Sequence, residues 1–113
     1  MICKILIGAI ALAGSVAVAG PISKFDNDTP DLEAVSPVAL FDIERCLTDM
    51  DKWPVPFIYR QPDRLSEVNL LWVANMTTIA RAHLVTTAEG VSVRIWGKIG
   101  NQAKSCVLTG KPR

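Results

Sequence analysis

Residues 79–98 read IARAHLVTTAEGVSVRIWGK, and this stretch decides the fold. It contains two alternating runs separated by the turn signal Ala88-Glu89-Gly90. One alternate set is apolar: Ala82, Leu84, Thr86, Val91, Val93 and Ile95. The other set is basic and aromatic in character: Arg81, His83, Val85, Ser92, Arg94 and Trp96. This period of two predicts a β-hairpin with one buried face and one basic, aromatic face.

Two loop lengths would pair apolar residues with apolar residues across this hairpin. With a two-residue turn Leu84 faces Ile95, and with a four-residue loop over residues 87–90 it faces Val93. A three-residue loop would place Leu84 opposite Arg94 and mix the faces, which is costly where one face is buried. The two faces are therefore predicted, while the register stays open between the two loop lengths.

The N-terminus has the pattern of a secretory signal peptide. A single charge at Lys4 is followed by an apolar run over residues 5–13, and Ala17-Val18-Ala19 precedes Gly20. The run is shorter than the roughly 20 residues that span a bilayer. We expect residues 1–19 to be removed between Ala19 and Gly20. The protein is then exported to a periplasm or the extracellular space, with no membrane attachment.

Cysteine usage agrees with export. Cys3 lies in the predicted signal peptide, which leaves Cys46 and Cys106. In a small exported domain an even pair predicts one disulfide. Two cysteines and one histidine are a poor set of metal ligands, so we expect neither a metal nor another cofactor.

Charge is balanced overall but divided along the chain. Lys and Arg number 12 against 11 Asp and Glu, which argues against a nucleic-acid partner. Residues 20–59 carry a net charge of −5 and residues 60–113 carry +5. Either the acidic half lies against the basic half, or the basic surface receives an anionic partner.

The first half of the chain predicts a leader, a helix and an edge strand. Residues 20–35 are acidic and contain two prolines, so we expect a flexible acidic leader. Ser36-Pro37 is a helix start signal, and apolar residues recur at helical spacing to about Met50. Residues 53–56 (WPVP) end that helix, and residues 57–61 between two prolines favour an edge strand.

The second half leaves one element open. Residues 65–78 fit a helix as well as a strand, although their β-branched and aromatic content favours the strand over residues 68–78. A last short element over residues 101–108 carries Cys106, and residues 110–113 are expected to fray. We therefore predict a single α+β domain over residues 36–109. One N-terminal helix packs on a mainly antiparallel sheet of three to four strands, with a single disulfide.

No catalytic motif is recognisable in the chain. His83 is the sole histidine, and the sequence assigns no carboxylate to orient it. The candidate binding residues are Arg81, His83, Arg94 and Trp96 on the outer hairpin face, extended by Tyr59, unless the acidic leader covers that face. We expect a non-enzymatic binding or interaction module whose partner is a protein or an anionic ligand. The alternatives are an exported inhibitor of a hydrolase, and a small-molecule carrier or small enzyme with a pocket between helix and sheet.

Overall fold

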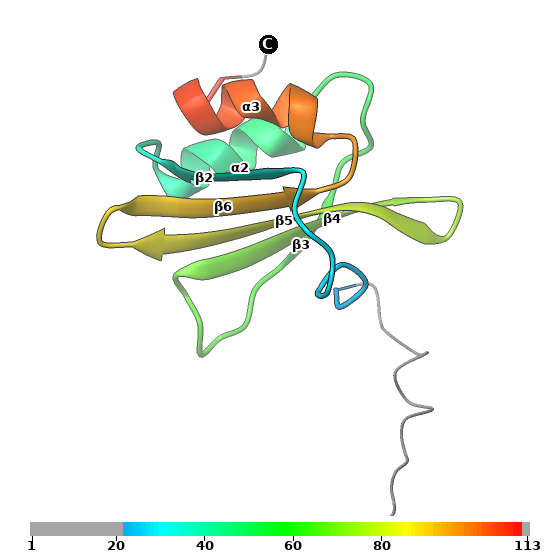
Figure 1. Cartoon of the computed structure of the whole chain (residues 1–113), viewed down its shortest axis with the longest axis horizontal. Helices are drawn as coiled ribbons and strands as arrows, with labels where there is room; N and C mark the ends of the chain where they lie inside the picture. The colour runs from blue at the N-terminus through cyan, green and yellow to red at the C-terminus, as the bar shows by residue number, and fades with distance from the viewer. Residues whose placement is uncertain (1–21, 112–113) are drawn as a thin grey trace, which may run out of the picture.

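A computed structural model describes residues 22–111, so the predicted signal peptide lies outside the described residues. The elements in chain order are β2 (Leu32–Ser36), α2 (Leu40–Thr48), β3 (Phe57–Tyr59), β4 (Glu67–Ala74), β5 (Thr77–Thr87), β6 (Gly90–Trp96) and α3 (Gly100–Thr109). The strands form one antiparallel sheet in the order β2-β6-β5-β4-β3, and both helices lie on one face of it (Figure 1). The α+β class with a single disulfide is confirmed. The described residues hold five strands and two helices, rather than three to four strands and one helix.

The β5–β6 hairpin has the register that was predicted for the longer loop. Leu84 pairs with Val93 and Arg81 pairs with Trp96, while Thr87 and Gly90 form the last pair before the turn. On the helix side of this hairpin, Leu84 and Val93 are fully buried. The predicted division into an inner apolar face and an outer basic, aromatic face is confirmed.

Residues 67–74 form strand β4, which confirms the strand interpretation of the ambiguous segment. Asn75 and Met76 make the turn to β5, and both have positive φ, as a two-residue hairpin turn requires. The pairing shifts between Trp72 and Val73, so that Ile79 becomes the extra residue of a β-bulge. As a strand, this segment pairs with both β3 and β5, whereas a helix here would leave the facing edges of those two strands unpaired.

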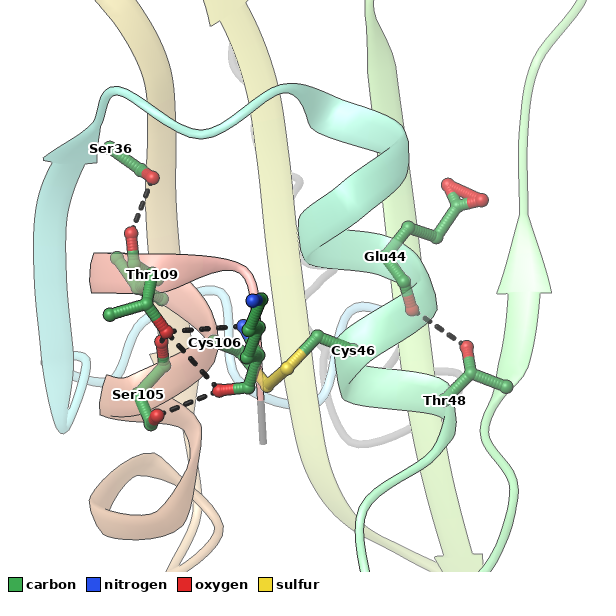
Figure 2. Close-up of a disulfide and its surroundings, with 9 residues drawn as sticks. Ser36, Glu44, Cys46, Thr48, Ser105, Cys106 and Thr109 are labelled. Carbon is green, nitrogen blue, oxygen red and sulfur yellow. Dashed lines mark hydrogen bonds between the residues drawn. A yellow bond between two sulfur atoms is a disulfide. The ribbon is translucent and has the colours of Figure 1, made fainter. Parts of the chain in front are cut away.

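The core lies between the inner face of the sheet and the two helices. The helices contribute the buried residues Ile43, Cys46, Leu47, Ala103, Cys106 and Val107. The predicted disulfide between Cys46 and Cys106 is present and joins α2 to α3, with 5.6 Å between the Cα atoms (Figure 2). A disulfide is consistent with an oxidising, exported location. No helix among residues 22–111 is long and apolar enough to cross a membrane.

The prediction of a flexible leader over residues 20–35 is wrong for its last four residues. Residues 32–36 form the edge strand β2, which pairs with β6 along its whole length. Leu32 and Ala34 pack against the core while Glu33 and Val35 point the other way. This alternation contributes an apolar face to the sheet, so the folded domain begins before residue 36.

The predicted start of the first helix is also wrong. Helix α2 begins at Leu40, because Ser36 belongs to β2 and its hydroxyl has other partners. The Ser36 Oγ donates a hydrogen bond to the carbonyl oxygen of Val107 and accepts one from the backbone N–H of Val38, at 2.5 and 3.0 Å. Figure 2 shows this side chain directed at α3. The serine therefore ties the sheet edge to the last helix.

The C-terminal helix α3 is longer than the short element that was expected over residues 101–108. Helix α3 closes at Gly110, which has a φ of +74° and donates its backbone N–H to the carbonyl oxygen of Cys106. The carbonyl oxygen of Lys111 accepts a hydrogen bond from the Ser105 hydroxyl at 2.7 Å. Residues 110 and 111 thus cap a helix instead of fraying, and residues 112–113 of the predicted frayed tail lie outside the described residues.

Candidate functional site

All five residues predicted to bind a partner lie on the outer face of the sheet, away from the helices. Strand pairing arranges this face in rows that cross the sheet. One row consists of Trp96, Arg81, Leu71 and Phe57. Its first three members are buried and are here called the covered row, whereas Phe57 is 66% exposed. The next row, the open row, consists of Glu33, Arg94, His83, Asn69 and Tyr59. The structure therefore brings Tyr59 and the hairpin residues onto one surface.

The N-terminal segment, residues 22–31, covers Trp96. The ring of Phe25 stacks on the indole, with 6.4 Å between centroids and 16° between planes. The indole N–H donates a hydrogen bond to the carbonyl oxygen of Asp28 at 2.8 Å, and Asp31 accepts one from the backbone N–H of Gly97 at 2.6 Å. Only 4% of Trp96 remains exposed. This aromatic side chain serves intramolecular packing and is not a free contact residue.

Arg81 is held in the same way. Its Nη1 donates to the Asp26 carboxylate at 2.7 Å and its Nε to the side-chain oxygen of Asn69 at 2.9 Å. The guanidinium group also lies 5.0 Å from the centre of the Trp96 ring. A buried cation needs such partners because it has lost its hydration. Here the acidic segment neutralises part of the basic face, as one of the two charge interpretations expects.

Most of the open row stays accessible, although Asn69 within it is buried. Arg94 is exposed, and its guanidinium group lies 5.6 Å from the Trp96 ring. His83 is half-buried, and Tyr59 is 40% exposed on the edge strand β3. In the adjacent row, Val35 of β2 is 58% exposed. The surface thus combines a cation, an aromatic side chain and an aliphatic side chain on a rigid sheet.

Glu67 supplies the carboxylate that sequence reasoning did not assign to His83. The Nε2 of His83 lies 2.5 Å from the Glu67 carboxylate, and Arg64 lies 3.6 Å from the same side chain. The hydrogen bond from the His83 ring is the main cause that holds the pKa of Glu67 below its ordinary value of 4.5. Glu67 is diagonal to His83 across the β4–β5 pair, since it pairs with Val85. Only the register of that pair could have revealed it.

The pair of Glu67 and His83 has the arrangement in which a carboxylate orients an imidazole ring. In such a pair the carboxylate accepts a hydrogen bond from one ring nitrogen, and the other ring nitrogen is left to contact solvent or a ligand. Within residues 22–111, no group of three or more His, Cys, Asp and Glu side chains is placed to hold a metal ion.

Two hollows of about 400 Å³ lie away from this pair. One runs along α2 and the end of α3, and its lining includes Asp42, Asp49, Arg45 and Lys111. The other lies where the N-terminal segment meets the loop that carries Trp53. Comparisons of the chain with protein-family models, with curated proteins and with solved structures found no match.

Proposed function

We propose that this protein is an exported, disulfide-stabilised and non-enzymatic binding module that contacts a protein partner through the open row. The accessible combination of Arg94, Tyr59 and Val35 on one face of a sheet carries the proposal. Arginine and tyrosine are over-represented among the residues that dominate protein interfaces. A matching partner offers a carboxylate to Arg94, and apolar side chains to Val35 and Tyr59 at the two edges of the sheet.

Export is part of the same proposal. The pattern of residues 1–19 and the disulfide between Cys46 and Cys106 both favour it. The mass of the protein recovered from the extracellular or periplasmic fraction should match a chain that begins at Gly20. A recovered chain that still carries residues 1–19, or one confined to the cytoplasm, would refute export.

Rigidity of the contact surface supports binding. The hydrogen bond from Arg81 to Asn69 and the contact of Glu67 with His83 fix the middle of the open row, so the sheet surface that carries Arg94 and Tyr59 is already ordered when a partner docks. A preorganised surface of this kind favours affinity.

Site-specific photo-crosslinking tests the proposal. A protein carrying Tyr59→p-benzoylphenylalanine is mixed with proteins of its native compartment and irradiated. The matched control carries the same probe at Leu108, which is exposed on α3 on the opposite side of the molecule. One discrete adduct is expected from position 59 and not from position 108.

Arg94→Ala should then weaken that adduct about tenfold or more, as expected when a central interface contact is removed. Lys104→Ala on α3 should leave it unchanged, since this exposed lysine lies on the helix side. Equal adducts from positions 59 and 108, or an adduct insensitive to Arg94→Ala, would contradict the assignment of this surface.

A further inference from the structure

The N-terminal segment forms one wall of a hollow at the end of the sheet. The hollow measures about 400 Å³, and its walls are mostly apolar. Phe25, Trp53 and Ile79 supply these walls, and the exposed lysines Lys24 and Lys98 complete the lining. Its residues come from four separate parts of the chain, so only the folded protein contains the site.

Independent contacts hold the three apolar walls in place. Phe25 is stacked on the buried Trp96. The indole N–H of Trp53 donates a hydrogen bond to the side-chain oxygen of Gln102 at 2.7 Å, so its polar edge is satisfied and the rest of the ring is apolar surface. Ile79 is the extra residue of the β-bulge and remains 36% exposed. A ligand would therefore meet walls that are already formed.

The two lysines give this apolar hollow a positive charge. Lys24 Nζ donates a hydrogen bond to the carbonyl oxygen of Thr78 at 2.6 Å and lies 5.5 Å from the centre of the Phe25 ring, so neither of these partners carries a negative charge. Lys98 has no ion pair and no side-chain hydrogen bond within residues 22–111. Asp26 and Asp31, the acidic side chains of the same segment with assigned contacts, are already bound to Arg81 and to a backbone N–H group. Neither forms an ion pair with Lys24 or Lys98.

We propose that this hollow binds a small organic monoanion with an apolar body, namely an alkyl or aromatic carboxylate. The apolar walls favour removal of the ligand's body from water, and the two ammonium groups favour its carboxylate. The volume falls at the small end of the range of roughly 300–1,000 Å³ that small-molecule sites occupy. The site is separate from the open row, so it goes beyond the proposed contact with a protein.

The test compares an acid with its neutral counterpart. Binding of 2-naphthoate and of decanoate is measured by isothermal titration calorimetry, with 2-naphthamide and decanol as uncharged probes. We expect the acids to bind about tenfold or more tightly than the neutral probes, as two nearby cations would require. The double variant Lys24→Ala/Lys98→Ala should remove this preference, and Lys104→Ala should retain it.

Trp53 reports the location of the ligand. The acids should change the tryptophan emission of the protein, and Trp53→Phe should abolish that change while affinity stays within a few fold, since an aromatic wall remains. The absence of binding by either acid at millimolar concentration would overturn the proposal. So would equal affinity for acid and neutral probes, or an unchanged preference in the double lysine variant. None of these outcomes bears on crosslinking at position 59, so the two proposals fail separately.

Discussion

The disulfide between Cys46 and Cys106 should supply a large share of the stability of this domain. It joins residues 60 positions apart, and the chain-entropy model gives about 4 kcal/mol for closing a loop of that length. Domains of this size have free energies of unfolding of roughly 5–15 kcal/mol. The variant Cys46→Ala/Cys106→Ala should therefore fold with a much smaller margin.

Urea denaturation followed by circular dichroism measures the effect. With a denaturant dependence of about 1–3 kcal/mol per molar urea, the midpoint should fall by roughly 1–4 M. The change in unfolding free energy per molar urea should itself increase, because an uncrosslinked denatured chain exposes more surface. Reduction of the unaltered protein should shift the midpoint in the same direction, and it leaves the buried sulfur atoms in place.

The expectation that the variant still folds rests on the other core contacts of the two helices. Ile43 and Leu47 of α2, and Ala103 and Val107 of α3, remain buried against the sheet without the disulfide. A loss of less than about 1 kcal/mol, with an unchanged denaturant dependence, would refute the argument from chain entropy.

Three further predictions concern individual contacts. Gly97→Ala should cost roughly 2–4 kcal/mol in urea denaturation, because its φ is +105° and the new methyl group would lie 2.6 Å from a backbone carbonyl oxygen of β5. Gly100→Ala, where the nearest atom lies at 3.5 Å, should be neutral or stabilising by up to about 1 kcal/mol. The lowered pKa of Glu67 stabilises the fold above the unfolded-state pKa, and this contribution is lost as pH falls through the folded-state value. His83→Leu removes the hydrogen-bond donor and should therefore flatten the decline in stability at acidic pH. Asp26→Asn should loosen the N-terminal segment and speed amide hydrogen exchange in residues 22–31.

Each of these has a clear contrary result. Equal stabilities for the two glycine variants would show that position 97 tolerates a side chain. An acid-stability profile that is the same with and without His83 would remove the role assigned to its hydrogen bond. Unchanged hydrogen exchange after Asp26→Asn would show that stacking of Phe25 on Trp96 holds the segment without the ion pair.

The hairpin shows how far local pattern carries a prediction of the fold. Alternation over residues 79–98 predicted both faces correctly, because side chains on a strand alternate whatever its partner is. The same pattern left two registers open, since both matched apolar with apolar residues. The register seen in the structure places Arg81 beside Trp96, where the N-terminal segment can cover both.

The N-terminal part of the domain was harder to predict. Prolines and acidic residues in positions 20–35 are typical of a flexible leader, yet residues 32–36 add a strand to the sheet. A five-residue edge strand has weak local signals, and its stability comes from the neighbouring strand. The Ser36-Pro37 signal was similarly overruled, because the serine hydroxyl finds its partner on α3, 71 residues away in the chain.

The candidate site likewise contains some features that the sequence predicted and others that only the structure decided. The structure places all five residues that were predicted to bind a partner on one face of the sheet. Exposure was not predictable, because it depends on Phe25 and Asp26 reaching Trp96 and Arg81 from more than fifty residues away. The partnership of Glu67 with His83 depends on the register of a second strand pair.

By itself the sequence determined the α+β class, the two faces of the hairpin and the disulfide pairing. Each of these follows from periodicity or from a cysteine count, which are properties of short stretches or of composition. The tertiary structure alone decided which part of the basic face is covered, which carboxylate meets His83, and where a hollow with two lysines forms. These features join residues that are distant in the chain, and packing of the whole core determines which of them meet.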